Sequence, residues 1–216
     1  MLLPVKRLEV AKSRLRGAVP GVAHESLVLA MAMDTLAAAL ASPAVGRVVV
    51  VHGDPVVARA AVELGGEAMP DVPDAGLNPA LAYAATLVRP RGATAQPGVV
   101  ALPADLPAMR TEDLTAVLHA ATATRAARTF VADAARTGTV LLAARPDAGL
   151  EPCFGSGSAA AHAASGAIAL TGDWPSLRRD VDTVADLVDA VRFGLGPRTS
   201  ALIGPAVLAG VERPGT

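Results

Sequence analysis

Short apolar runs that alternate with longer segments of helical period constrain this chain more than any other feature. Strand-like runs occur at residues 2–5, 47–52, 67–69, 98–102, 129–131, 138–143 and 167–170. Apolar residues at helical spacing occur between them, at 25–41, 55–64, 78–88, 112–122, 158–164 and 183–191. Because strands that alternate with helices build a parallel sheet covered by helices, we expect an α/β fold with three layers, αβα, and a mainly parallel central sheet.

The alternation loosens after residue 122. Two strand-like runs follow each other directly, and a Gly/Ser-rich loop precedes the next helical segment. We expect this departure to mark an insertion over a substrate site. The segment after residue 194 is rich in Gly and Pro, which interrupt regular structure. We therefore predict a single domain over residues 1–195 and a peripheral C-terminal tail, with one short helix, over residues 196–216.

The charge balance argues against a nucleic-acid partner. The chain has 19 Lys and Arg against 20 Asp and Glu, and nonspecific nucleic-acid binding needs an excess of basic residues. A single cysteine, Cys153, excludes an intrachain disulfide and a cysteine-based metal cluster. The start is too short for a signal peptide, and no apolar run reaches the roughly 20 residues that span a bilayer. We expect a soluble cytoplasmic protein without membrane contacts.

Positive charge gathers directly after the first strand-like run. Ligands of open parallel sheets bind beyond the carboxyl ends of the strands, so a polyphosphate could be neutralised there. The alternative is a solvated surface loop whose charges only favour solubility. The five cations of this opening loop are Lys6, Arg7, Lys12, Arg14 and Arg16.

Carboxylates follow two other apolar segments. Asp105 stands between Pro103 and Pro107 in "VVALPADLPAM", where it could bind a hard cation or cap a turn. Asp180 and Asp182 stand two positions apart in "RRDVDTVADL". In an extended segment they would face the same side and could share Mg²⁺; alternatively Asp182 or the next residue, a threonine, is the N-cap of the following helix.

The segments "TGT" (137–139) and "FGSGS" (154–158) contain small and hydroxylated residues. Small residues that open a helix leave backbone N–H groups exposed for a phosphate or carboxylate, but a flexible linker has the same composition. The second segment matches GxGxxA. It does not follow the first strand of a βαβ unit, which excludes a nicotinamide dinucleotide site.

In their order along the chain, the motifs "PVKRLEVAKSRL", "LNPAL", "PADLPAM", "TGT", "FGSGS" and "RRDVDTVADL" match one family over roughly residues 2 to 200. The chain resembles the CofC/FbiD guanylyltransferases of coenzyme F-420 biosynthesis. That resemblance implies the nucleotide-diphospho-sugar transferase-like fold, also called MobA-like. It also implies transfer of GMP from GTP to the phosphate of a phosphorylated three-carbon acid, with release of pyrophosphate.

The resemblance assigns roles to particular residues. It implies that Asp105 and Asp182 bind Mg²⁺, and that Thr139, Gly155 and Ser158 bind the acid. Asn78 is then the amide available to the guanine or ribose. Of the opening loop we expect Lys6, Lys12 and Arg14 to bind the nucleotide and to act in catalysis, because they would balance the charge of the departing pyrophosphate. We expect Arg7 and Arg16 to be solvated.

Several alternatives remain open at this point. The branch that the chain resembles most uses phosphoenolpyruvate, and others use 2-phospho-L-lactate or 3-phosphoglycerate; the unstable product could be handed to the next pathway enzyme. An alternative of another class is a metal-dependent glycosyltransferase that uses Asp180 and Asp182 on a sugar nucleotide. A third is a nucleotide-binding domain without catalytic activity.

Overall fold

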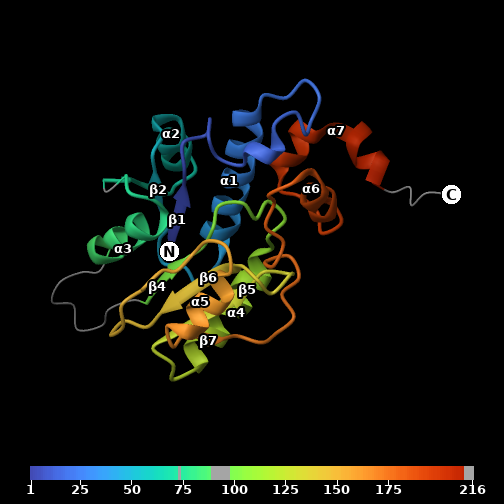
Figure 1. Ribbon diagram of the computed structural model, residues 1–216. Coiled ribbons are helices and arrows are strands. Elements are labelled where there is room, and N and C mark those ends of the chain that lie inside the picture. The colour runs from blue at the N-terminus through green and yellow to red at the C-terminus, as the bar shows by residue number, and fades with distance from the viewer. Residues whose placement is uncertain (73, 89–97, 212–216) are drawn as a thin grey trace.

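The described part of the chain forms one sheet with helices on both faces (Figure 1). The structure is a computed structural model, and it describes residues 1–72, 74–88 and 98–211. The strands are β1 (Leu2–Val5), β2 (Val49–His52), β3 (Glu67–Pro70), β4 (Val99–Ala101), β5 (Arg128–Ala132), β6 (Thr139–Ala144) and β7 (Ile168–Ala169). The helices are α1 (His24–Ala41), α2 (Pro55–Glu63), α3 (Leu77–Leu87), α4 (Thr111–Ala123), α5 (Ser158–Ala164), α6 (Val184–Val191) and α7 (Pro197–Val211), and a short 3-10 helix, η1 (Ser13–Leu15), lies in the opening loop.

The sheet has seven strands in the order β3-β2-β1-β4-β6-β5-β7. β1, β2, β3 and β4 are parallel, and β7 is parallel to β5, whereas β6 is antiparallel to both of its neighbours. This arrangement confirms the prediction of an α/β fold with a mainly parallel central sheet. The expectation of an insertion after residue 122 was wrong for the two strands themselves. β5 and β6 pair with each other inside the sheet, because both runs are apolar enough to be buried between helices.

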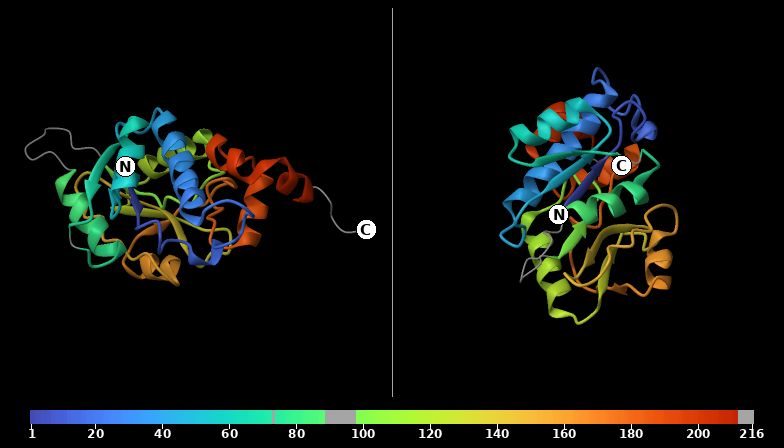
Figure 2. Two further views of the ribbon diagram at one scale, coloured as in Figure 1. Left: turned by 90° about the horizontal axis from the view of Figure 1, so that it is seen from above. Right: turned by 90° about the vertical axis from the view of Figure 1, so that its left-hand side faces the viewer.

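Two apolar clusters, one on each face of the sheet, make up the three layers. Alternate residues of a strand point to opposite faces, so Leu3 packs in one cluster and Leu2 in the other. The first cluster includes residues of α1, α2, α4, α6 and α7, and the second includes residues of α3 and α5. The two layers of helices can be followed on either side of the strands in Figure 2.

β1 and β4 separate early, and this opens the sheet where a ligand can bind. They pair at Leu2 and Ala101, and the N–H of Leu102 donates to the carbonyl of Leu2. The next donor on this side of β1 would be residue 4, but Pro4 has no N–H and so cannot continue the ladder. The chain order also reverses here, because β2 lies on one side of β1 and β4 on the other. A strand-order switch of this kind is where open α/β sheets bind their ligands.

α1 has the length and composition of a helix that could cross a membrane, and no other described helix does. Most of it is buried in this fold: 61% of the 18-residue segment lies inside the structure. Its Asp34 carboxylate, 1% exposed, accepts hydrogen bonds from the N–H groups of Arg198 (3.1 Å) and Thr199 (2.7 Å). The apolar character of α1 is therefore accounted for by its place between the sheet and α7.

The segment that we predicted as a peripheral tail begins with α7. Thr199 and Ile203 are buried, and the helix is interrupted at Gly204, whose φ of 68° a side chain would disfavour. The first turns of α7 are thus packed against α1. Residues 212–216 of the predicted tail lie outside the described residues, and the domain boundary after residue 195 stays a prediction.

Candidate active site

The opening loop begins at the carboxyl end of β1, next to the strand-order switch, and leads to the start of α1. At its centre Lys12 has left-handed backbone angles, φ 51° and ψ 42°, which are uncommon for a residue with a side chain. His24, at the start of α1, holds the loop here, because its Nε2 hydrogen-bonds the carbonyl of Ala11 at 2.6 Å. The backbone at Lys12 is therefore fixed by its surroundings, as strained residues at functional sites usually are.

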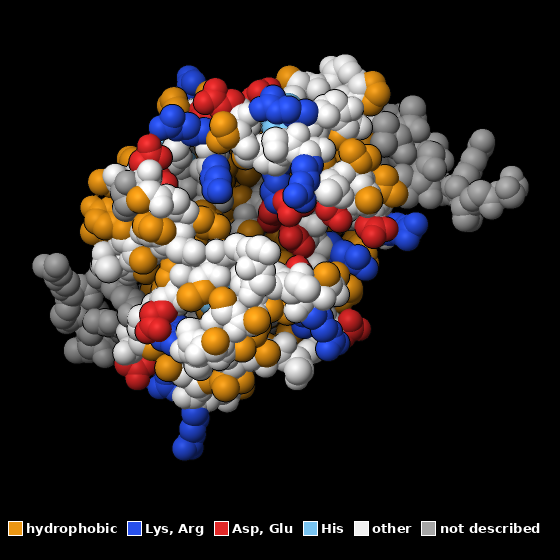
Figure 3. Space-filling model, viewed as in Figure 1, with side chains coloured by type: hydrophobic (Ala, Val, Ile, Leu, Met, Phe, Trp, Pro, Cys, Tyr) orange, Lys and Arg blue, Asp and Glu red, His pale blue; other side chains and the backbone are white. Residues whose placement is uncertain are grey.

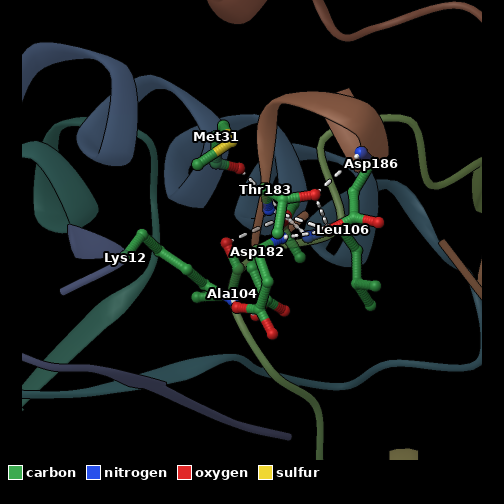
Figure 4. A network of polar contacts seen from close by, with 9 residues as sticks. Lys12, Met31, Ala104, Leu106, Asp182, Thr183 and Asp186 are labelled. Atoms are coloured by element: carbon green, nitrogen blue, oxygen red, sulfur yellow. Dashed lines mark hydrogen bonds and ion pairs between the residues drawn. The ribbon is translucent and has the colours of Figure 1, made fainter. Parts of the chain in front are cut away.

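Lys12 joins two carboxylates from distant parts of the chain. Its Nζ contacts Oδ2 of Asp105 and Oδ1 of Asp182. Figure 4 shows the Lys12 side chain reaching from its loop toward Asp182, beside the backbone at Ala104. The Lys12 and Asp105 side chains are only 18% and 17% exposed, so this ion pair is shielded from water. The two carboxylates raise the pKa of Lys12, although burial opposes them as the largest single influence.

Asp105 is held by its backbone from two sides. Thr35, buried in α1, accepts a hydrogen bond from the N–H of Leu106 at 3.1 Å. Its hydroxyl proton lies between two carbonyls, that of Met31 at 2.9 Å and that of Ala104 at 3.3 Å. The carbonyl of Asp105 accepts from the N–H of Val181 at 3.0 Å, next to Asp182. The two acidic loops are thus joined through the main chain, which brings both carboxylates to the same ammonium.

The segment before α6 shows which residue of the second acidic motif caps that helix. Thr183 is the N-cap of α6 and forms a capping box with Asp186. Asp186 Oδ2 also accepts from the N–H of Asp182 at 3.1 Å. Because Thr183 and Asp186 satisfy the helix start, the Asp182 side chain is left to point to Lys12.

Asp180 is close to this cluster and has an altered pKa. Burial, followed by the negative charge of Asp105, raises the pKa of Asp180 to about 7, and Lys12 opposes that shift. A carboxyl group with this pKa is about half protonated at pH 7, so it adds less negative charge to the cluster than a fully ionised carboxylate. Asp180 is therefore a poorer partner for a cation than Asp105 or Asp182.

A cavity of about 450 Å³ lies at this point. Its walls contain three cations of the opening loop (Lys6, Lys12 and Arg14) and the two carboxylates Asp105 and Asp182, together with apolar residues of α1. Figure 3 shows the face of the molecule hollowed in its middle, with acidic side chains gathered along one wall and basic side chains around the rim. Arg7 and Arg16 bind elsewhere: Arg7 pairs with Asp74 at 3.2 Å on the surface, and Arg16 donates to the carbonyl of Glu9.

The residues around Asp105 fit a hard cation such as Mg²⁺. Asp105 lines the cavity, and its Oδ1 atom is buried without a hydrogen-bond partner. Among the described residues no group of three or more His, Cys, Asp or Glu side chains could hold a metal alone. Two carboxylates are nevertheless sufficient for Mg²⁺, which usually takes one or two from the protein and completes its shell with phosphate oxygens and water.

A second polar cluster lies around the start of α5. Thr139 opens β6, and its Oγ1 lies 2.9 Å from Nδ1 of the fully buried His162. The Nε2 atom of His162 accepts a hydrogen bond from the N–H of Cys153, also at 2.9 Å. Ser158 is buried, and Gly155 has a φ of +136°, a conformation that side chains rarely adopt. We call Thr139, Cys153, Gly155, Ser158 and His162 the Thr139 cluster.

Asn78 has a structural role that the sequence did not predict. It lies in the first turn of α3, and its amide makes two hydrogen bonds with the backbone of Phe154: Oδ1 accepts from the N–H at 2.8 Å, and Nδ2 donates to the carbonyl at 2.9 Å. The amide thus fastens α3 to the loop that precedes α5. A contact between Asn78 and the nucleotide stays a prediction.

The structure therefore divides the predicted site residues into two groups. Lys6, Lys12, Arg14, Asp105 and Asp182 surround one cavity, as expected for loops that follow the carboxyl ends of parallel strands. Among the described residues, the walls of this cavity do not include Thr139, Gly155 or Ser158. The two groups are connected by the loop between β5 and β6, where the N–H of Ala134 donates to the carbonyl of Arg178 at 3.0 Å.

Sequence reasoning missed Thr35 and His162. Thr35 has no sequence signal, since it is one of many small residues on an apolar helix. The signal for His162 is its spacing of four residues from Ser158, which places both on one side of a helix.

Comparison with solved structures defines the class of fold. A nucleotide-diphospho-sugar transferase of Desulfovibrio desulfuricans superposes with a TM-score of 0.66 at 18% identity, over 97% of this chain and 96% of the other. A CMP:2-keto-3-deoxy-manno-octonic acid synthetase superposes with a TM-score of 0.55, also at 18% identity, over 88% of this chain and 95% of the other. The chain thus has a nucleotide-diphospho-sugar transferase-like fold, as predicted.

Comparison of sequences defines the family. The family model "Guanylyl transferase CofC like" matches residues 1–200. Phosphoenolpyruvate guanylyltransferases of Salinispora arenicola and Geodermatophilus obscurus are 56% and 52% identical to this chain, and each alignment covers 95% of it and 94% of the relative. The chain belongs to the CofC-like guanylyltransferase family, and this confirms the resemblance inferred from its motifs.

Proposed function

We propose that this protein transfers GMP from GTP to the phosphate of phosphoenolpyruvate in the biosynthesis of coenzyme F-420. The products would be enolpyruvyl-2-diphospho-5'-guanosine and pyrophosphate. The choice of phosphoenolpyruvate rests on relatives of that name that share about half of their residues with this chain over nearly its full length. We place the reaction in the cytoplasm, where the unstable product could pass directly to the next enzyme of the pathway.

The observation that carries the proposal is the cavity at the strand-order switch, where cations and carboxylates converge. GTP and the acceptor are both anions and repel each other, so positive charge is needed to bring them together. Lys6, Lys12 and Arg14 would supply it on one side. Asp105 and Asp182 would hold Mg²⁺, which, when bound, neutralises phosphate oxygens and favours the departure of pyrophosphate.

The reaction itself requires no covalent intermediate with the protein. An oxygen of the acceptor phosphate forms a bond with the α-phosphorus of GTP, and the bond from that phosphorus to the oxygen bridging to the β-phosphate breaks. The bridging oxygen and its electron pair leave with pyrophosphate. What the protein contributes is an in-line arrangement of two bound anions and compensation of the charge that develops on the leaving group.

Thr139, Gly155 and Ser158 are our candidates for binding the acid. They belong to the Thr139 cluster, which the loop between β5 and β6 connects to the segment before Asp182. Their hydroxyl and backbone N–H groups are neutral hydrogen-bond donors. Neutral donors suit the carboxylate or phosphate of a small acid that must be released after reaction. Asn78 would contribute indirectly, because it holds the backbone of Phe154.

The deciding experiment is incubation with GTP and Mg²⁺ together with phosphoenolpyruvate, 2-phospho-L-lactate or 3-phosphoglycerate, with measurement of pyrophosphate and of the product mass. We expect the fastest pyrophosphate release with phosphoenolpyruvate. Faster release with another acid would reassign the acceptor. No release with any of them would refute the proposal, and transfer or hydrolysis of a UDP- or GDP-sugar would favour the glycosyltransferase alternative.

A further inference from the structure

His162 is a buried imidazole to which the proposed reaction has so far given no role. It is 0% exposed and lies on α5, one helical turn beyond Ser158. Phe154 packs edge-on against its ring, with centroids 5.1 Å apart, and Phe130 packs at 5.9 Å. The ring is therefore fixed in orientation by apolar contacts as well as by its hydrogen bonds.

The hydrogen bonds of His162 determine which nitrogen carries the proton. The backbone N–H of Cys153 can only donate, so Nε2, which it contacts at 2.9 Å, must be the acceptor. Burial lowers the pKa of His162; the backbone of Ser158 opposes this shift, and the charge of Arg128 adds to it. Because the net shift lowers a pKa that is ordinarily below 7, the ring is neutral at physiological pH. A neutral ring with an unprotonated Nε2 has its proton on Nδ1.

This tautomer orients the hydroxyl of Thr139. The Nδ1 atom faces Thr139 Oγ1 at 2.9 Å. Because Nδ1 carries the proton, Oγ1 accepts from it. A threonine hydroxyl has one proton besides its two lone pairs, so the proton of Thr139 stays available for another acceptor.

The same histidine holds the neighbouring loop. Its bond to Cys153 holds the residue that precedes the "FGSGS" segment, and Asn78 holds Phe154, the first residue of that segment. Thr139 and the backbone that leads to Gly155 are thus both tied to one rigid ring. An anion that binds between them meets donors that are already aligned, which reduces the entropy lost on binding.

We propose that His162 is a positioning residue for the acceptor substrate: its Nδ1–H holds Thr139 Oγ1 so that the threonine hydroxyl donates to an anionic oxygen of the phosphorylated acid. The inference rests on the proposed function, because it takes the acid to be the ligand of the Thr139 cluster. The inference explains why the Thr139 hydroxyl acts as a donor. It also predicts that changes at His162 affect the binding of the acid and not the binding of GTP.

The test uses two substitutions that each keep one of the two ring contacts. In His162→Gln the amide reaches the position of Nε2 and can accept from Cys153, but Thr139 loses its donor. In His162→Asn the amide nitrogen takes the position of Nδ1 and keeps the donor to Thr139. His119→Gln, on the exposed face of α4, is the matched control.

The readouts are kcat and the KM values for phosphoenolpyruvate and GTP, measured by pyrophosphate release, with thermal unfolding to check the fold. We expect His162→Gln to raise the KM for phosphoenolpyruvate about tenfold and to leave the KM for GTP unchanged, as expected for one hydrogen bond to a charged group. His162→Asn should raise it less than about threefold, and His119→Gln should have no effect. Adding Thr139→Val to His162→Gln should raise the KM no further, because both changes remove the same donor.

Three results would overturn the inference in an active wild-type enzyme. They are an unchanged KM for phosphoenolpyruvate in folded His162→Gln, an equal rise in both KM values, or multiplying effects of His162→Gln and Thr139→Val. If His162→Gln does not fold, a tenfold rise in the KM of His162→Asn for phosphoenolpyruvate would overturn the inference instead. An inactive wild-type enzyme with every acid would refute the proposed function, which is a different outcome.

Discussion

The cavity at the strand-order switch and the Thr139 cluster differ in the kind of polar group that they contain. The first brings Lys12, Asp105 and Asp182 together, and one buried carboxylate oxygen lacks a hydrogen-bond partner. The second contains a neutral histidine between Thr139 and Cys153, both within hydrogen-bond distance. The charged site is thus compensated within the protein until a ligand arrives, whereas the neutral site is already arranged.

This difference suits the two ligands proposed for them. A nucleoside triphosphate with Mg²⁺ carries enough charge to displace an internal ion pair, and substitutions in the cavity should therefore change turnover strongly. A small acid gains only a few hydrogen bonds, so substitutions in the Thr139 cluster should change its affinity moderately. The predictions below test this contrast, and the roughly tenfold effect expected for His162→Gln is the reference for the neutral site.

The largest effect is expected from Asp105→Asn. The substitution keeps the volume of the side chain but removes the charge that would hold Mg²⁺, so turnover should fall by about 10³-fold, equivalent to about 4 kcal/mol of transition-state stabilisation. The measurement is pyrophosphate release at saturating GTP. Asp147→Asn, an exposed position after β6, is the control. A fall of less than tenfold would show that Asp105 is not a metal ligand in the reaction.

Lys12→Met should have two effects of opposite direction. Turnover should fall by about 10²-fold, because the positive charge beside the phosphates is lost. The affinity of the nucleotide-free protein for Mn²⁺ should rise by about tenfold, or about 1.4 kcal/mol, because the ammonium no longer occupies the space between the carboxylates. Titration with Mn²⁺ measures the second effect. Unchanged or weaker Mn²⁺ binding would contradict the competition between Lys12 and the metal.

The smallest effect concerns stability and pH at Asp180. Its pKa is raised from 3.8 to about 7 in the folded protein, so the folded state binds the proton more tightly than the unfolded state. The contribution of Asp180 to the free energy of unfolding is therefore most favourable below pH 3.8, and it decreases as the pH rises toward 7. Asp180→Asn removes that penalty, so its Tm should exceed that of the wild type by a few degrees at pH 8, with little difference at pH 4. An equal difference at both pH values would exclude the pKa of Asp180 as the cause.

Much of the fold could be predicted, because it depends on local patterns. Each predicted strand and helix up to residue 191 is found within two residues of its expected ends. The reversed strand β6 could not be recognised, since a buried parallel strand and a buried antiparallel strand have the same apolar pattern. α7 was underestimated because the residue that anchors it, Asp34, lies 164 positions away from Arg198 in the sequence.

The candidate site could be predicted as a set of residues but not as an arrangement. The positions of the cations and carboxylates at the ends of strand-like runs made them candidates, and the family resemblance selected Asp105 and Asp182 as metal ligands. Lys12, Asp105 and Asp182 do meet. Their contact depends on separations of 93 and 170 residues, which no local pattern encodes. The hydrogen bonds of Asn78 to the backbone of Phe154 could not be predicted either, because the two residues are 76 positions apart in the sequence.

The chain itself thus specifies the elements, their layers and the residues that can bind an anion or a cation, because these follow from periodicity and chemical type along a few neighbouring positions. Folding settles which of those residues share a cavity, which proton state His162 adopts and which carboxylate has a raised pKa. Those properties depend on burial and on partners brought from other parts of the chain, and burial and distance are defined in three dimensions alone.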